Sequence, residues 1–305
     1  MGIDDISRVV EAVKTRLPSL GYKIDEPMKN HTSFKVGGPV RAMCFPRNTG
    51  ELIELRGLLR EYGIEPLIIG NGTNILINDA RLDMIAIKTA GLGNMDFDGQ
   101  CEITAGAGVP LSKLAELAHS YGLSGLEFAY GIPGSAGGAV SMNAGAYGGE
   151  MKDVVQRTSV YSMETGMYTV SGNEHDFSYR GSRFSGSSDI VVSTVLRLQK
   201  GNKNSIKAKM DELIARRGES QPLDMASAGS TFKRPEEGYA ASFIEQAGLK
   251  GFTIGGAQVS EKHSGFIVNR GAATFAEIVA VIEYVQESVL KRFGVYLEPE
   301  VKIIR

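Results

Sequence analysis

Two glycine-rich segments are the first features of the chain that could bind a ligand. The first follows the apolar run 66–69 and consists of Gly70, Asn71, Gly72, Thr73 and Asn74. Glycine permits positive φ and a close approach of the backbone, so successive N–H groups can surround an anion. The hydroxyl and amide side chains that follow could add hydrogen bonds to a diphosphate. The plainer alternative is a turn that only ends a strand, because short glycine motifs are weak signals.

The second glycine-rich segment covers residues 131–140, and its candidate ligand-binding residues are Gly131, Ile132, Pro133, Gly134, Ser135 and Gly138. Two loops with few side chains suit a long diphosphate ligand such as a dinucleotide. Glycine costs up to about 1 kcal/mol per position in a regular element, which favours a purpose for so many of them. The alternative is a tightly packed backbone crossing. Neither segment has a Walker A lysine or the Rossmann glycine pattern, which is evidence against a standard NAD-binding domain.

Two segments bring cations that could act on an anionic substrate. Arg180 stands in the turn-rich segment 179–184 and offers a planar fork to carboxylate or phosphate. The alternative for this arginine is a solvated loop. Further along, the hydroxyl of Ser230 is followed closely by the adjacent cations Lys233 and Arg234. This combination suits an anionic substrate, and its alternative is a capping turn with surface charges.

Two carboxylates near the C-terminus complete the polar candidates. Glu298 and Glu300 flank Pro299, which confines the backbone and would help to direct the second carboxylate. The local pattern by itself favours the alternative, an edge strand protected by charge. Sequence spacing does not show whether a serine, an arginine and a glutamate from these remote segments meet.

The elements that must position these segments alternate between helix and strand. Apolar spacing predicts helices at residues 3–17, 51–62, 112–121, 205–217, 239–247 and 275–293, with Ser112 as the cap of the third. Strands are predicted at residues 42–45, 66–69, 84–88, 101–105, 154–161, 167–170, 190–198, near 254, 266–268 and 297–304. The predicted class is therefore α+β. The polar, turn-prone segment 201–205 predicts a domain boundary.

The composition indicates a folded protein whose 305 residues are too many for one small core. Its 33 basic and 35 acidic side chains give a net charge of −2, so neither nucleic acid nor an anionic membrane is expected as a partner. The N-terminus lacks the pattern of a signal peptide, so we expect a cytoplasmic protein in which Cys44 and Cys101 are free thiols. The uncharged stretch 128–149 has too many glycines for a lipid-exposed helix. Four scattered histidines predict no metal site.

Taken together, these motifs resemble those of a known family, the UDP-N-acetylenolpyruvoylglucosamine reductases of bacterial peptidoglycan synthesis. The matching motifs occur in the family's order, cover nearly the whole chain and lie at residues 32–38, 70–74, 131–135, 143–148, 179–182, 229–233 and 297–301. Segment 179–182 reads Tyr-Arg-Gly-Ser with no long insertion after it. This form is similar to the shorter class of these enzymes, which lacks a tyrosine-bearing substrate lid.

The resemblance implies a fold and a set of ligands. The expected fold is a two-subdomain FAD-binding fold of the vanillyl-alcohol-oxidase (PCMH) type over residues 31–200. An N-terminal helical segment (1–30) would precede it, and a C-terminal α+β substrate domain (201–305) would follow. The implied cofactors are non-covalent FAD and NADPH, and the implied substrate is UDP-N-acetylglucosamine enolpyruvate. The protein is expected to be a monomer or a weak homo-oligomer.

The resemblance also assigns roles to individual residues. Both glycine-rich segments and Tyr179 would bind FAD. Arg180 would stabilise the negative charge that develops beside the substrate carboxylate. Ser230 would deliver a proton to C2 as general acid, and Glu300 would help to polarise the enol ether.

Three more residues, Lys233, Arg234 and His263, would contact the substrate, although the sequence around His263 taken alone favours an ordinary loop histidine. Many members have Asn where this chain has Arg234, so the phosphate contact expected there would be ionic. Thr73 replaces a common serine and keeps its hydroxyl. Two rival functions stay open: an FAD-linked oxidase of the same fold, and a non-catalytic protein that binds sugar nucleotides.

Overall fold

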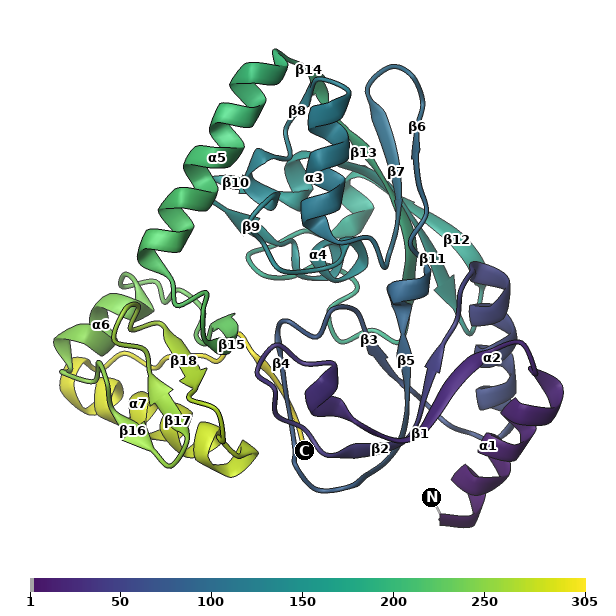
Figure 1. Ribbon diagram of the computed structural model, residues 1–305, viewed down its shortest axis with the longest axis horizontal. Coiled ribbons are helices and arrows are strands. Elements are labelled where there is room, and N and C mark those ends of the chain that lie inside the picture. Colours follow the sequence, from purple (N-terminus) through teal and green to yellow (C-terminus); the bar gives the residue numbers. More distant parts are fainter. Residues whose placement is uncertain (1–2) are drawn as a thin grey trace. The chain divides into compact units, whose positions relative to one another are not determined.

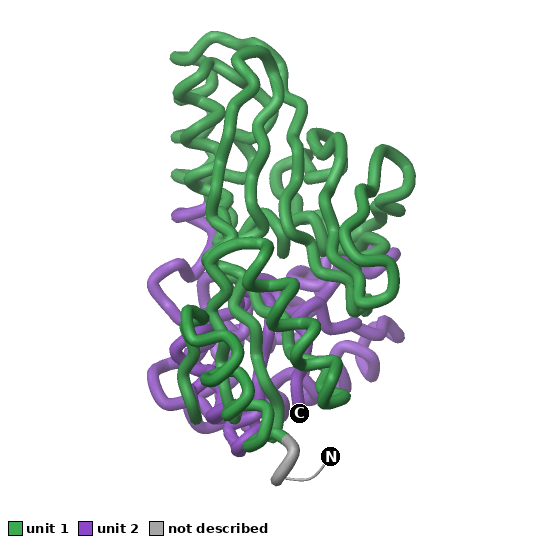
Figure 2. The backbone as a smooth tube through the Cα atoms, turned by 90° about the vertical axis from the view of Figure 1, so that its right-hand side faces the viewer, with its two compact units in different colours: residues 1–25, 41–71, 83–215 green, residues 26–40, 72–82, 216–305 purple. Residues whose placement is uncertain are grey.

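The computed structural model describes residues 3–305 and groups them into two compact units, which Figure 2 colours separately. Unit 1 holds the residues up to 25, residues 41–71 and residues 83–215. Unit 2 holds residues 26–40, 72–82 and 216–305. Two short N-terminal segments therefore pack with the C-terminal third of the chain. The domain limits predicted at residues 30 and 200 stay a prediction, because compact packing units need not coincide with functional domains.

Unit 1 contains both helices and sheets (Figure 1). Its helices are α1 (Ile3–Arg16), α2 (Thr49–Glu61), α3 (Leu111–Ser120), α4 (Ala136–Met142) and most of α5 (Lys203–Ser220). Its strands are β1 (Gly21–Pro27), β2 (Pro39–Phe45), β3 (Leu67–Ile69), β5 (Leu82–Lys88), β6 (Met95–Phe97), β7 (Glu102–Gly106), β8 (Leu123–Ser124), β9 (Gly145–Ala146), β10 (Gly149–Glu150), β11 (Val155–Ser162), β12 (Gly166–Ser171), β13 (Ile190–Arg197) and β14 (Gln199–Lys200); a few residues at the edges of β1, β2 and β5 belong to unit 2. The predicted hairpin 154–170 is confirmed as β11 and β12, and Gly166, the first residue of β12 after the turn, has a φ of 74°.

Two sheets support the glycine-rich segments of unit 1. The first has the strand order β1-β2-β5-β3, and its β3 and β5 run parallel. The second has the order β12-β11-β13-β7-β6 and is antiparallel. Apolar side chains of α2 and β5, among them Leu55, Leu59, Ile85 and Ile87, are fully buried in one core cluster. Burying such side chains contributes about 1.5–3 kcal/mol each, which fixes these elements in place.

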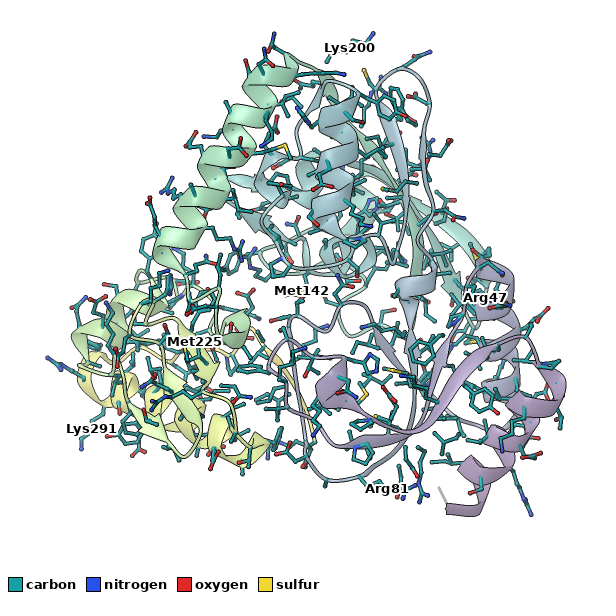
Figure 3. All side chains as sticks on the ribbon, viewed as in Figure 1. Arg47, Arg81, Met142, Lys200, Met225 and Lys291 are labelled. Atoms are coloured by element: carbon teal, nitrogen blue, oxygen red, sulfur yellow. The ribbon has the colours of Figure 1, made fainter. Side chains whose placement is uncertain are left out.

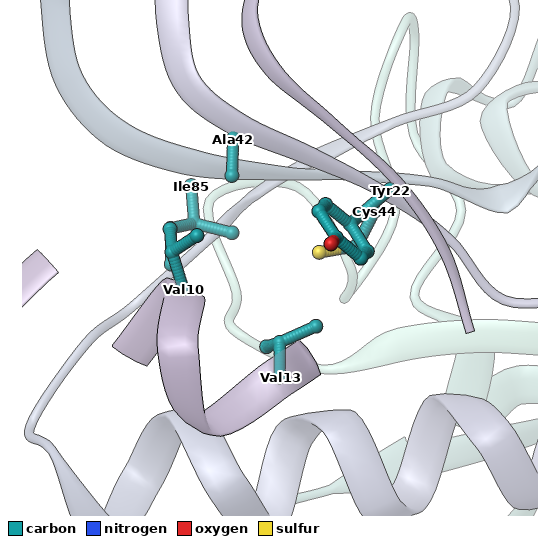
Figure 4. Close-up of a pocket in the computed structure, with 6 residues that line it drawn as sticks. All are labelled: Val10, Val13, Tyr22, Ala42, Cys44 and Ile85. Carbon is teal, nitrogen blue, oxygen red and sulfur yellow. The ribbon is translucent and has the colours of Figure 1, made fainter. Parts of the chain in front are cut away.

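A small apolar pocket lies between α1 and the first sheet, and no candidate ligand-binding residue is among the side chains that line it (Figure 4). It is lined by Val10, Val13, Tyr22, Ala42, Cys44 and Ile85 and is too narrow to admit a water molecule. Burial raises the pKa of the Cys44 thiol to about 12, so this cysteine behaves as a small core residue.

Unit 2 is a smaller α+β body. Its helices are α6 (Ala240–Gln246) and α7 (Phe275–Phe293), and its strands are β4 (Ile75–Ile77), β15 (Ala226–Ser230), β16 (Thr253–Ile254), β17 (Ala257–Val259), β18 (Phe266–Asn269) and β19 (Lys302–Ile304). Four of these strands form an antiparallel sheet in the order β15-β18-β17-β16, while β19 pairs in parallel with β4.

Of the helices that the structure describes, none is long and apolar enough to span a bilayer.

Three local predictions were wrong in detail. The closing strand is confined to β19, because Pro299 has no N–H to donate and the residues around it form only an isolated bridge to Phe232. Ser112 lies inside α3, whose N-cap is Pro110. Segment 131–140 is a loop only as far as Ser135, and α4 follows it; Figure 3 labels Met142 at the end of this helix.

Candidate cofactor and substrate site

The first glycine of segment 70–74 fits closely against the second glycine-rich loop. Gly70 directly follows β3, and a Cβ atom added to it would collide with the Oγ of Ser135. Ser135 is only 2% exposed, and within the described part of the chain its Oγ has no hydrogen-bond partner. A buried hydroxyl that lacks a partner costs free energy unless a ligand satisfies it. This hydroxyl, packed against the bare backbone of Gly70, therefore fits a polar ligand group.

The C-terminal end of the second loop is held by backbone hydrogen bonds to the segment after β7. Leu111 N donates to Gly134 O (3.0 Å), Ala136 N to Val109 O (2.8 Å), and Gly137 N to Ala107 O (2.9 Å). A Cβ on Gly137 would lie 2.7 Å from that of Ala107, so this glycine serves a close backbone crossing. Gly138 is exposed in the first turn of α4. The alternative of a close backbone crossing therefore holds for Gly137, whereas Gly138 makes no such crossing.

The rest of the first glycine segment belongs to unit 2, where it packs against the chain around residue 31. Gly72 has φ 66°, a left-handed value that glycine adopts freely, and a Cβ on it would collide with the carbonyl of His31. Ser33 N donates to Gly72 O (3.0 Å). Asn74 Nδ2 donates to Glu300 O (2.9 Å), and Thr73 beside it is half-buried. A hydrogen bond therefore connects the segment that bears Thr73 and Asn74 with the chain around Glu300, just before β19.

Ser230 and Glu300 lie on segments that meet at Thr231. Ser230 ends β15 opposite Phe266, after a register shift that contains Gly229 at φ 76°. Thr231 is 1% exposed, and its Oγ1 accepts a hydrogen bond from Ile267 N (3.1 Å). Glu300 N donates to the carbonyl of Thr231 (2.8 Å). Two of the three predicted catalytic residues are thus neighbours in unit 2.

The predicted substrate-binding residues stand close to the same segment. Lys233 donates its backbone N–H to Glu298 O (2.9 Å), and its Nζ lies 2.5 Å from the Glu298 carboxylate. The guanidinium of Arg234 lies 4.1 Å from the ring centre of Tyr239. Burial lowers the pKa of His263, whose Nδ1 accepts a hydrogen bond from Gly265 N (3.2 Å). His263 is therefore neutral near pH 7 and has a local structural partner.

Arg180 lies in unit 1, in a turn that the side chain of Asn143 positions. Its φ is 54°, its Nη1 donates to Gly145 O (3.3 Å), and it packs 5.4 Å from the ring of the exposed Tyr179. Asn143 is 1% exposed, and its Nδ2 donates to Ser178 O (2.9 Å), the residue before this turn, and to Glu150 (2.8 Å). A hydrogen bond from Lys152, and more weakly the charge of Arg180, lower the pKa of Glu150.

Sequence reasoning did not identify Asn143 as a candidate site residue. Its left-handed φ of 44° at the end of α4 is a conformation for which asparagine is enriched. The available signal was an asparagine that follows an apolar run and precedes a glycine-rich segment, a pattern that is common at helix ends.

The structure thus divides the predicted site residues between the units. In unit 1 lie Gly70, Asn71, Gly131, Ile132, Pro133, Gly134, Ser135, Gly138, Tyr179 and Arg180; in unit 2 lie Gly72, Thr73, Asn74, Ser230, Lys233, Arg234, His263 and Glu300. The roles of these residues stay a prediction. No group of three or more metal-ligating side chains occurs between residues 3 and 305.

Comparisons with known proteins identify both parts of the fold. The family model described as "FAD binding domain" matches residues 40–172, and the model described as "UDP-N-acetylenolpyruvoylglucosamine reductase, C-terminal domain" matches residues 221–304. The chain is 48% identical to the UDP-N-acetylenolpyruvoylglucosamine reductase of Caldanaerobacter subterraneus subsp. tengcongensis, over 97% of this chain and 98% of that protein. It is 47% identical to the enzyme of the same name from Clostridioides difficile, over 92% and 93%.

A solved structure agrees with these sequence matches. The crystal structure of the reductase from Thermus caldophilus is 31% identical and superimposes with a TM-score of 0.79, over 94% of this chain and 99% of that one. An FAD-binding domain joined to this C-terminal domain defines a flavin-dependent oxidoreductase with FAD as its cofactor. The chain belongs to the UDP-N-acetylenolpyruvoylglucosamine reductase family. The predicted fold class, an FAD-binding fold followed by an α+β C-terminal domain, is confirmed.

Proposed function

We propose that this protein uses NADPH to reduce UDP-N-acetylglucosamine enolpyruvate to UDP-N-acetylmuramate, a cytoplasmic step in the synthesis of peptidoglycan precursors. The observation that carries the proposal is the junction at Thr231, which holds Ser230 and Glu300 on adjacent segments in a member of this reductase family. Bound FAD supplies hydride transfer, from NADPH to the methylene carbon C3 of the enolpyruvyl group. A proton added at C2 then completes the reduction.

The residues around Gly70 fit FAD. The buried hydroxyl of Ser135, which has no partner among the described residues, and the side-chain-free backbone of Gly70 packed against it suit the diphosphate of the cofactor. We assign the same function to the loop 131–135 and to the backbone of segment 70–74. Tyr179, 51% exposed, would contribute its ring to the cofactor.

Three side chains would then serve the reduction itself. The guanidinium of Arg180 would stabilise the enolate charge that develops next to the substrate carboxylate, an effect typically worth several kcal/mol. The Ser230 hydroxyl would donate the proton to C2, and the Glu300 carboxylate would polarise the enol ether through a hydrogen bond. The substrate phosphates would be bound by the cations Lys233 and Arg234, with His263 as a neutral hydrogen-bonding group.

A visible spectrum of the purified protein, followed by anaerobic additions, tests this function. We expect the purified protein to contain a bound flavin. NADPH should bleach its visible absorbance, and the enolpyruvyl sugar nucleotide should restore that absorbance. A colourless protein that cannot take up FAD would indicate a sugar-nucleotide-binding protein instead. A flavin that a sugar or an alcohol reduces, but NADPH does not, would indicate an oxidase.

A further inference from the structure

A lysine outside the predicted site ends the strand beside the first glycine segment. Lys88 is the last residue of β5, which lies next to β3 in Figure 1, and it pairs in parallel register with Ile69. The preceding pair, Ile68 and Ile87, packs into the core of unit 1. Because side chains alternate along a strand, Ile69 and Lys88 point to the opposite face of the sheet. The side chain of Lys88 therefore faces away from the core cluster. Its pairing partner, Ile69, directly precedes Gly70.

The ammonium of Lys88 is half-buried and makes no hydrogen bond or ion pair within residues 3–305. Burial alone lowers its pKa, with no compensating charge. Lys233, which is half-buried as well, has a carboxylate partner in Glu298. A cation that loses water without gaining a partner is destabilising. This arrangement is accounted for if an anion that is not part of the chain lies against Lys88.

Close contacts connect the end of β5 with the residues that flank both glycine loops. The Oγ1 of Thr89, the residue after Lys88, donates to Ile69 O (3.3 Å). A Cβ on Gly108 would collide with the carbonyl of Thr89, and the next residue, Val109, accepts the hydrogen bond from Ala136 N. Lys88 therefore stands within the framework that carries Gly70 and the unpartnered hydroxyl of Ser135.

We propose that Lys88 binds the diphosphate of FAD and supplies the cation that the two glycine loops lack. Adjacent strands lie about 4.8 Å apart and successive Cα atoms about 3.8 Å apart, so a lysine side chain at this position can reach an anion on the N–H groups of Gly70 and Asn71. The inference rests on the proposed placement of the diphosphate on these loops. A charge-assisted contact of this kind corresponds to about a ten- to hundredfold change in affinity.

Flavin titrations of the whole chain, stripped of its cofactor, test this proposal. The ligands are FAD and riboflavin, which has no phosphate, each at several salt concentrations. The variants are Lys88→Met, which keeps the length of the side chain, and Lys88→Arg, which keeps the charge. Lys113→Met is the matched control, because Lys113 is exposed on α3 of the same unit.

Lys88→Met is expected to raise the Kd for FAD ten- to hundredfold, to leave the Kd for riboflavin unchanged and to weaken the salt dependence. Lys88→Arg and Lys113→Met should stay within about threefold of wild type. The melting temperature of stripped Lys88→Met should equal or exceed that of wild type, because a destabilising buried charge is gone. A merely structural lysine would instead lower that temperature and weaken both flavins equally, which would overturn the proposal.

The same titrations separate two kinds of failure. If wild type binds FAD far more tightly than riboflavin and Lys88→Met does so equally, the role of Lys88 is wrong and the glycine loops keep theirs. If wild type binds both flavins equally, the placement of the diphosphate itself is wrong, and this inference is overturned with it.

Discussion

Arg180 and Asn143 both occupy the left-handed backbone region, with φ of 54° and 44°. For a non-glycine residue this conformation costs roughly 1–3 kcal/mol and persists only where neighbouring contacts enforce it. Here the enforcing contact is the side chain of Asn143, which bonds the carbonyl of Ser178 just before the arginine turn. Strain of this kind concentrates at functional sites, which supports the role proposed for Arg180.

His175 predicts an acid sensitivity of the fold. It is 0% exposed, its Nδ1 bonds Gly172 O, and its Nε2 lies 2.9 Å from the Thr158 hydroxyl. Burial is the largest cause that lowers its pKa; the charge of Arg183 acts in the same direction, while the Gly172 carbonyl and Glu174 oppose it. The folded state therefore favours the neutral ring, and its contribution to stability is lost as pH falls below the unfolded pKa of about 6.5.

Urea unfolding at pH 7.5 and pH 5.5 measures this effect. Wild type should lose more stability on acidification than His175→Gln, which cannot be protonated in this range. Because burial also lowers the pKa of His263, part of the acid sensitivity should persist in the variant. An unchanged difference between the two pH values in His175→Gln would show that this ring is not responsible.

At the scale of elements, α7 depends on its first turn. Thr274 accepts a hydrogen bond from Glu277 N, and the Glu277 carboxylate accepts one from Thr274 N, which forms a capping box. Thr274→Ala should lower the free energy of unfolding by about 1 kcal/mol. Thr165→Ala, in the exposed hairpin turn, should change it by less than about 0.5 kcal/mol. Equal effects in chemical denaturation would contradict the capping role.

The same helix shows what the sequence could predict. Helix 275–293 was predicted to the residue, because its apolar period, its capping threonine and the glycine after it all agree. Helix α4 was missed, because glycines at 137 and 138 lower its intrinsic helix propensity. Its stability comes from packing against Ala107, about thirty residues earlier in the chain, which no local pattern reports.

Prediction of the site was limited in the same way. Glycine motifs are local, so both loops could be found from spacing. Lys88 could not be, because its proximity to Gly70 arises from the parallel pairing of β3 and β5. The neighbourhood of Ser230 and Glu300 likewise depends on a long-range hydrogen bond at Thr231. Sequence spacing contains no information about such contacts, and the family resemblance was needed to group these residues.

At the scale of the whole molecule, the candidate site residues are distributed over both units. Segment 70–74 itself is divided, since its first two residues belong to unit 1 and its last three to unit 2. Arg180 belongs to unit 1, whereas Ser230 belongs to unit 2. The proposed reaction requires both side chains, so the function must be measured on the complete chain and one half-reaction at a time.

Rapid mixing of Ser230→Ala under anaerobic conditions tests the central claim, that the Ser230 hydroxyl protonates the reduced substrate. Bleaching of the flavin by NADPH should proceed within about twofold of the wild-type rate, because no proton from Ser230 is needed in that step. Recovery of flavin absorbance on addition of the enolpyruvyl sugar nucleotide should slow by about 10²-fold or more. Ser227→Ala, on the same strand, should behave as wild type in both steps. Equal slowing of the two steps by Ser230→Ala, or recovery at the wild-type rate, would contradict the account.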